Sequence, residues 1–186
     1  MSWIVPLNVT IFAEDITFSY GETRINVTVL EDSGIPVPEG TITLELNDET
    51  YTADIINGTA TFDIDVLPKG EYTLNYSINM DKVYNPASNS STLTVVAFKT
   101  NITVNASDIK VGDDAIITVT VDSDATGNIT VNNETKEVKD GTATFTISGL
   151  GEGNFTYEVV YSGDDKYTKE TAEVEFEVTK VSDYEF

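Results

Sequence analysis

The stretch Asn57-Gly-Thr-Ala-Thr-Phe62 recurs 83 residues later as Asp140-Gly-Thr-Ala-Thr-Phe145, and this repetition decides the fold. At the same offset, Leu67-Pro-Lys-Gly-Glu-Tyr-Thr73 matches Leu150-Gly-Glu-Gly-Asn-Phe-Thr156. Further upstream the offset is larger, because the first copy carries an insertion around Gly34-Ile-Pro-Val-Pro38. Since the matched segments follow one another in the same order, the chain consists of two copies of one structural unit.

Within each copy, apolar residues recur at every second position. Ile25, Val27 and Val29 alternate with polar residues, and the segment 173–178 alternates glutamate with valine or phenylalanine. Alternation of this kind places one set of side chains in a core and the other in water, as in one layer of a β-sandwich. No segment has the period of an amphipathic helix, so the sequence predicts an all-β protein.

Turn chemistry agrees with the periodicity. Asn57-Gly58 and Asp140-Gly141 are two-residue hairpin signals, because both central residues of such a turn need a positive φ. The spacing of turn signals predicts about seven short strands per copy, which is the pattern of an immunoglobulin-like sandwich. Tyr72 stands where such folds often have a tyrosine corner. The second copy has Phe155 there, so core packing is the role we predict for this position.

The predicted architecture is therefore two tandem immunoglobulin-like, Greek-key β-sandwich domains, residues 1–98 and residues 99–186. Leu93–Phe98 reads as the last strand of the first domain and Asn101–Val104 as the first strand of the second. The join contains no run of glycine, serine or proline, so we expect a restricted hinge between the domains.

Composition excludes several classes of function. The net charge is −22, with 32 acidic against 10 basic residues, which argues against nucleic acid and anionic membranes as partners. The chain has no histidine and no cysteine, so it lacks Ser–His and Cys–His nucleophiles and disulfides. Among 32 carboxylates a catalytic-looking pair is uninformative, and we predict no enzyme activity. Residues 1–6 lack the features of a secretion signal or a membrane span, so we expect a piece of a longer secreted protein.

The second copy resembles a known family most clearly at Gly141-Thr-Ala-Thr-Phe-Thr-Ile147, Gly153-Asn-Phe-Thr156 and Tyr161-Ser-Gly-Asp-Asp-Lys-Tyr167. These residues are similar to the Ig-like repeats of adhesin-like surface proteins from methanogenic archaea. The first copy has diverged in the last segment and reads Ile78-Asn-Met-Asp-Lys-Val-Tyr84. The resemblance implies an extracellular, cell-surface protein in which such domains repeat in series, and it carries over no catalytic or ligand-binding residue.

The motif Asn-x-Ser/Thr is unusually dense. Its asparagines, ten of the 14 in the chain, are Asn8, Asn26, Asn57, Asn75, Asn89, Asn101, Asn105, Asn128, Asn133 and Asn154. Strand faces rich in asparagine and threonine produce the motif by alternation alone, and selection for N-glycosylation would produce it too. Both interpretations stay open at this point. We expect Asn57 in a hairpin turn and Asn89 in a loop to be the most accessible.

Calcium is the only cofactor that the residues suggest. Local acidic clusters are Asp113-Asp114, Asp122-Ser-Asp124 and Asp164-Asp165, and hard cations bind where several oxygen ligands converge. Aspartates in turns also bind backbone N–H groups, and this structural role is the alternative interpretation.

The leading functional hypothesis is a structural spacer or stalk in cell adhesion, monomeric as an isolated chain. A rival is a module that binds glycan, cell-wall polymer or protein, for which exposed aromatic residues would be the signal: Trp3, Tyr20, Tyr51 and Tyr184. A third hypothesis is assembly through the apolar segment Ile4–Phe12, pairing with an open strand edge of another copy.

Overall fold

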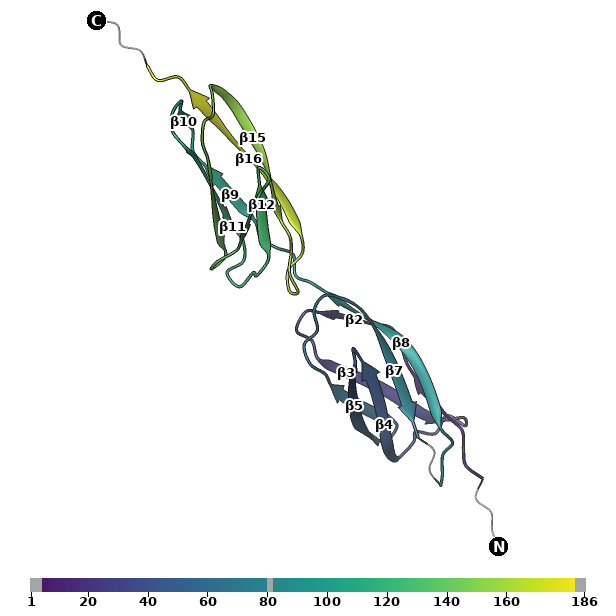
Figure 1. Cartoon of the computed structure of the whole chain (residues 1–186). Coiled ribbons are helices and arrows are strands. Elements are labelled where there is room, and N and C mark those ends of the chain that lie inside the picture. Colours follow the sequence, from purple (N-terminus) through teal and green to yellow (C-terminus); the bar gives the residue numbers. More distant parts are fainter. Residues whose placement is uncertain (1–4, 80–81, 183–186) are drawn as a thin grey trace, which may run out of the picture. The chain divides into compact units, whose positions relative to one another are not determined.

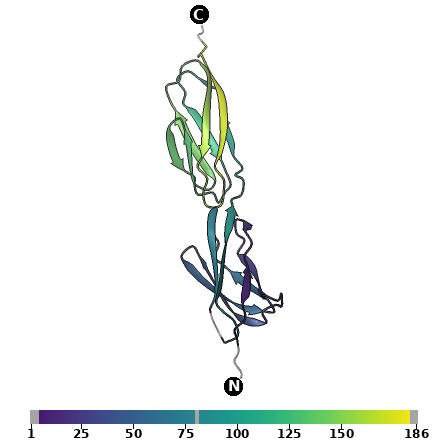
Figure 2. The same ribbon diagram turned by 90° about the vertical axis from the view of Figure 1, so that its right-hand side faces the viewer.

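A computed structural model describes residues 5–79 and 82–182, and the chain forms two compact units, Met1–Val96 and Ala97–Phe186 (Figure 1). The described residues of both units form β-strands joined by turns and loops, gathered in two layers in each unit (Figure 2). This part of the chain contains no helix long and apolar enough to cross a lipid bilayer.

The described residues of the first unit form eight strands. They are β1 (Val9–Phe12), β2 (Ile16–Ser19), β3 (Arg24–Glu31), β4 (Glu39–Leu46), β5 (Glu49–Ile56), β6 (Thr59–Asp63), β7 (Gly70–Ile78) and β8 (Ala87–Val96). They hydrogen-bond in the order β1-β3-β6-β5-β4-β7-β8-β2. Between β5 and β6 the only pair is Ile56–Thr59, so the sheet folds over at this hairpin into two layers.

The second unit repeats this plan with two separate sheets. Its strands are β9 (Thr103–Ala106), β10 (Ile109–Lys110), β11 (Ala115–Thr120), β12 (Asn128–Val131), β13 (Glu134–Glu137), β14 (Thr142–Ile147), β15 (Gly153–Tyr161) and β16 (Glu170–Thr179). One sheet has the order β10-β16-β15-β12-β13 and the other the order β14-β11-β9. Both units are therefore all-β immunoglobulin-like sandwiches, as the sequence predicts.

The strand count differs from the prediction, because the described part of each unit has eight strands rather than about seven. The extra strand comes from the start of each unit, where the chain crosses from one layer to the other. β1 pairs antiparallel with β3, whereas β2 pairs parallel with the last strand, β8. β9 and β10 repeat this crossing with β11 and β16. Strands this short give too little alternation to be separated by sequence pattern.

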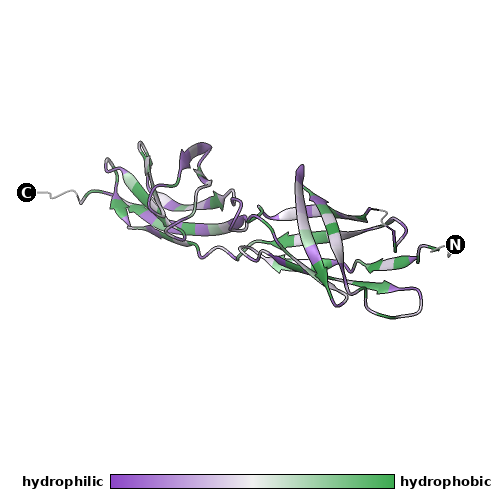
Figure 3. Ribbon diagram, turned by 90° about the horizontal axis from the view of Figure 1, so that it is seen from below, coloured by the Kyte–Doolittle hydropathy of each residue, from purple (hydrophilic) through white to green (hydrophobic). Residues whose placement is uncertain are grey.

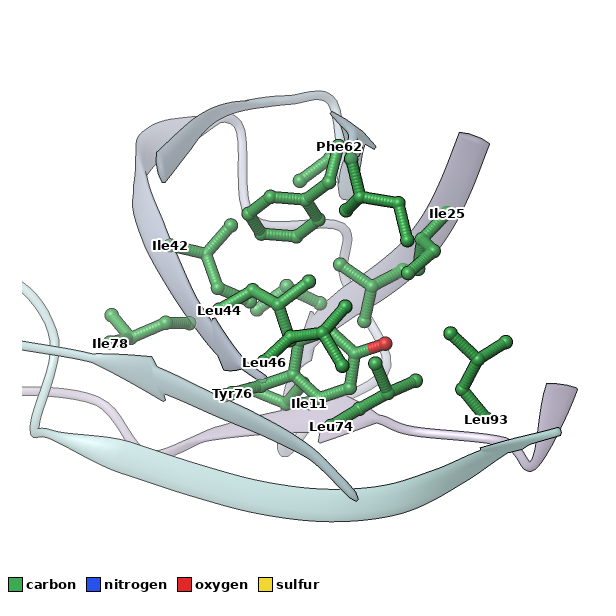
Figure 4. Packing of buried hydrophobic residues seen from close by; sticks show 14 of the residues in the cluster. Ile11, Ile25, Ile42, Leu44, Leu46, Phe62, Leu74, Tyr76, Ile78 and Leu93 are labelled. Carbon is green, nitrogen blue, oxygen red and sulfur yellow. The ribbon is translucent and has the colours of Figure 1, made fainter. Parts of the chain in front are cut away.

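Each unit has its own core, built by the alternation in its strands (Figure 3). In the first unit, Val29, Leu44 and Leu74 are fully buried between the layers. Figure 4 shows this cluster, with Ile78 and Leu93 toward opposite ends of it. Each such aliphatic side chain stabilises the unit by about 1.5–3 kcal/mol through its removal from water.

The predicted hairpin turns are confirmed. Asn57 and Gly58 both have positive φ, 49° and 80°, between β5 and β6. Asp140 and Gly141 have φ values of 51° and 74°, and the residues that flank this turn exchange two backbone hydrogen bonds. Two further turns of the same kind contain no glycine, Asn47-Asp48 and Asn132-Asn133, and the sequence pattern did not single them out.

The tyrosine corner forms in one copy. The Tyr72 hydroxyl donates a 2.7 Å hydrogen bond to the carbonyl oxygen of Pro68. Phe155, which takes the place of Tyr72 in the second copy, has no hydroxyl and stacks on Phe176, with ring centroids 5.8 Å apart. Core packing is therefore the role the two copies share, and the first copy adds a hydrogen bond.

Candidate functional site

A dense polar cluster lies in the loop between β15 and β16. The Asp164 carboxylate accepts four hydrogen bonds at its two oxygens. Oδ1 accepts the backbone N–H groups of Lys166 at 2.8 Å and Tyr167 at 2.7 Å. Oδ2 accepts the Thr126 N–H at 2.8 Å and the Tyr161 hydroxyl at 2.6 Å. One carboxylate thus holds the loop, the end of β15 and the segment before β12 together.

A second carboxylate extends the cluster. Asp124 accepts a hydrogen bond from the Tyr167 hydroxyl at 2.6 Å and forms an ion pair with Lys166 Nζ, also at 2.6 Å. The Lys166 ammonium also lies 5.5 Å from the centre of the Tyr167 ring. Because these groups are partly exposed, water screens the ion pair, and the main effect of the contact is to orient the loop.

The electrostatics of the cluster favour ionised carboxylates. Burial raises the pKa of Asp164, but the bonds from Tyr161 and from three backbone N–H groups outweigh it and hold the pKa below the ordinary value. For Asp124, the bond from Lys166 and then that from Tyr167 lower the pKa. Burial, followed by the bond to Asp164, raises the pKa of the Tyr161 hydroxyl. Tyr161 therefore stays protonated and donates.

Tyr161-Ser-Gly-Asp-Asp-Lys-Tyr167, the most specific part of the sequence resemblance, is thus a structural motif. Tyr161 is fully buried and Tyr167 nearly so. Each of the two hydroxyls donates to an aspartate. Asp165 is exposed and takes no part in these bonds. The arrangement locks the loop between β15 and β16 onto its own unit.

The other acidic clusters suggested for calcium have similar structural partners. Asp122 accepts hydrogen bonds from Asn101, at 3.0 Å from the backbone N–H and 3.2 Å from the side-chain amide. Asp113 accepts the Lys110 N–H at 3.3 Å, and Asp114 accepts the Ser148 hydroxyl at 2.7 Å. Within residues 5–79 and 82–182, no three acidic residues come together in a group that could hold a metal ion. The geometry favours the turn-stabilising interpretation of these aspartates.

All ten asparagines of the Asn-x-Ser/Thr motif are exposed residues, distributed over both units. Asn26, Asn75, Asn89, Asn105, Asn128 and Asn154 lie within strands. Asn57 and Asn133 lie in two-residue turns, and Asn8 and Asn101 precede the first strand of each unit. The motif therefore marks no single face, loop cluster or pocket.

The expectation that Asn89 lies in a loop is wrong, because Asn89 belongs to β8. Its amide nitrogen donates a 2.8 Å hydrogen bond to the carbonyl oxygen of Ile11 in β1, across the open edge of the sandwich. The hydroxyl residue of its motif, Ser91, is buried. Strand residues 88–92 are all polar, which made the segment look like a loop. Asn57 lies in an exposed turn, as expected.

The suggested aromatic residues form no common surface in the described structure. Trp3 and Tyr184 lie outside the described residues. Tyr51 packs against the first core, and its hydroxyl accepts a 3.4 Å hydrogen bond from the Asp65 N–H. Tyr20 is half-buried. Of the suggested assembly segment, Ile4 is outside the described residues, while β1 pairs with β3 and ends the sheet order.

A comparison with protein families agrees with the immunoglobulin-like sandwich of the second unit. Residues 102–179 match the sequence model of the bacterial Ig-like domain (group 3). The second unit is thus similar to a domain family known from bacteria, and no catalytic family is found. A comparison with curated proteins gave no match.

Several solved structures are similar at low identity. The fibronectin(III)-like modules of Clostridium thermocellum CbhA are 18% identical, with a TM-score of 0.38, covering 96% of this chain and 98% of theirs. The Yersinia pseudotuberculosis adhesin InvE is 17% identical, with a TM-score of 0.42, covering 90% of this chain and 58% of that one. The N-terminal eight Ig domains of Down Syndrome Cell Adhesion Molecule are 15% identical, with a TM-score of 0.44, covering 96% and 27%. With scores this low, none of these likenesses bears on function.

Proposed function

We propose that this chain is a non-catalytic, extracellular repeat module of an adhesin-like surface protein, and that it acts as a spacer or stalk. The observation that carries the proposal is that the polar side chains of the motif Tyr161–Tyr167 are bonded within their own unit. Its carboxylates and hydroxyls bond to groups of their own sandwich and hold a loop onto it.

The join between the units supports a spacer. The carbonyl oxygen of Val96 accepts the Tyr20 N–H at 2.9 Å, which ties the end of β8 to the first unit. The N–H of Phe98 donates to the Lys166 carbonyl at 2.8 Å, which ties Phe98 to the second unit. Only Ala97 stands between these two anchored residues, so the join is too short to act as a long flexible tether.

The acidic surface and the spread of Asn-x-Ser/Thr motifs fit the same role. Like charges keep neighbouring copies apart, and glycans at the exposed asparagines, Asn57 foremost, would cover the sheet faces. The proposal places the module on a cell surface, monomeric as an isolated chain. The archaeal resemblance of the second copy remains a prediction.

The test is a pull-down of the purified chain with isolated wall polysaccharides, performed once with calcium and once with chelator. A spacer is expected to bind none of them saturably in either condition. Saturable binding to a polysaccharide would contradict the spacer role and establish the adhesive alternative. Loss of that binding with chelator would show that calcium takes part.

A further inference from the structure

In the described part of the first unit, β5 has one long edge that is almost unpaired. Along one side, β5 pairs with β4 over all eight of its residues. Along the other side it pairs with β6 at Ile56–Thr59 alone. An edge of this length is a template to which another strand can add, and natural sheets protect such edges with lysine, proline, bulges or short strands. β5 contains neither lysine nor proline.

Three residues of β5 direct their backbone groups toward this edge. In an antiparallel pair, successive residues point their N–H and C=O groups alternately toward the partner strand and away from it. The Asn57 N–H donates to the Pro38 carbonyl at 3.0 Å, which places the odd-numbered residues of β5 on the β4 side. Thr50, Thr52 and Asp54 therefore point these groups outward. No strand within residues 5–79 and 82–182 pairs with them there.

The second unit protects the equivalent edge. Its edge strand, β13, follows the turn Asn132-Asn133 as β5 follows Asn47-Asp48, and it has only four residues. Lys136 of β13 points inward, where its ammonium donates to the Thr144 carbonyl of β14 at 2.7 Å and lies 5.2 Å from the ring centre of Phe145. A short strand and an inward-pointing charge are two of the devices that prevent another strand from adding.

Tyr51 takes the place of Lys136 in the first unit, since each is the third residue after its turn. Tyr51 is half-buried and packs against the first core, as does Ala53. From Tyr51 to Ile55 the inward-facing side of β5 carries no charged residue. A strand added beside β5 could therefore bury apolar side chains against Tyr51 and Ala53.

The outer face of the same layer is acidic. Asp54 on β5 and Glu45 on β4 are exposed on this face. The strands β4, β5 and β7 contain no lysine or arginine, and their carboxylates are Glu39, Glu45, Glu49, Asp54 and Glu71. Outer side chains of an added strand would continue this face, so charge complementarity favours lysine or arginine at those positions.

We propose that the free edge of β5 binds an extended segment of a partner protein, which adds to the sheet as a further strand. Its backbone pairs with the outward groups of Thr50, Thr52 and Asp54. Its apolar side chains pack on Tyr51 and Ala53, and its basic side chains lie on the acidic outer face. A second copy of this chain is a poorer partner, because each copy carries a net charge of −22. The proposal goes beyond the spacer role and is independent of it.

The test titrates the ¹⁵N-labelled full chain with the acetylated, amidated peptide Val-Lys-Val-Lys-Val-Lys. The matched control is the same peptide with methylated backbone nitrogens, which keeps every charge but cannot pair with a strand. Saturable NMR shifts and slower amide exchange are expected at Thr50, Thr52 and Asp54 with the first peptide only. Equal shifts with both peptides would overturn the proposal, since charge alone would then explain the binding. No saturable shift, or equal shifts at Thr135 on the protected edge, would overturn it too.

Two variants sharpen the result. Thr52→Pro removes an N–H group that points to the free edge, and proline is tolerated on edge strands, so the fold is expected to survive. Tyr51→Lys gives this edge the inward charge that Lys136 supplies in the second unit. Each variant is expected to weaken binding of the peptide about tenfold or more, whereas Thr135→Pro, the matched control in β13, should leave it unchanged. An unchanged affinity in either folded variant would refute the assignment.

Discussion

Replacing Asp164 by alanine is expected to destabilise the second unit far more than any other single aspartate change. The substitution removes the acceptor of four hydrogen bonds of 2.6–2.8 Å. It leaves the Tyr161 hydroxyl, which is fully buried, without its carboxylate. It also releases two N–H groups of the loop that follows Asp164.

The magnitude follows from these bonds. A hydrogen bond to a charged group contributes about 1.5–3 kcal/mol, and four on one carboxylate are not additive. Because Asp164 is partly exposed, water replaces some of what is lost, and we expect a loss of about 3 kcal/mol in the free energy of unfolding. For a domain of this size, that lowers the midpoint of thermal unfolding by about 12–24 °C.

Calorimetry or circular dichroism of the full chain measures this change. Asp165→Ala is the matched control, since Asp165 is the exposed neighbour outside the network. Its effect should stay within about 0.5 kcal/mol. The transition of the first unit, which has its own core, should not move in either variant. Equal effects of the two substitutions, or a wild-type midpoint that falls with chelator, would refute the structural reading of Asp164.

Four other outcomes are expected. Gly58→Ala should cost at least about 1 kcal/mol in denaturant unfolding, because φ is +80° and the new Cβ would lie 2.7 Å from a proline carbon; an unchanged midpoint would contradict this. Tyr72→Phe should cost about 1 kcal/mol through the lost corner bond, and no cost would mean that the bond adds nothing. The pKa of Asp164 is depressed in the folded state, so its stabilisation is present above the unfolded-state pKa and is lost as pH falls below about 4. Unfolding measured from pH 7 to pH 2 should therefore show the second unit losing stability before the first. The same loss of stability at low pH in the Asp164→Asn variant would contradict the assignment to Asp164. In an N-glycosylating host, mass spectrometry should find sugar on Asn57 and none on Asn89, and the reverse pattern would refute the accessibility argument.

The strand pattern and the tight turns could be predicted from sequence because they depend on local chemistry. Alternation around Ile25–Val29 fixes which side chains are buried, and Asn57-Gly58 fixes a turn by its demand for positive φ. The glycine-free turn Asn132-Asn133 escaped prediction, because asparagine enters this conformation less readily than glycine does.

Contacts between distant segments could not be predicted in this way. The bond from Asn89 to Ile11 joins residues 78 apart in sequence, so the polar run read as a loop although it is a strand. The bond from Asp164 to Thr126 likewise depends on how the sheets meet.

The stiffness of the join is the most direct test of the spacer account. The chain has no cysteine, so spin labels can be placed uniquely at Thr52→Cys on β5 and Thr156→Cys on β15, both exposed strand positions. The control pair is Thr120→Cys with Thr156→Cys, inside the second unit. Double electron–electron resonance should give a distribution of label-to-label distances between the units that is about as narrow as the distribution for the control pair. A broad distribution of distances would contradict the account, because a spacer whose units rotate freely about Ala97 cannot keep its two ends at a fixed separation.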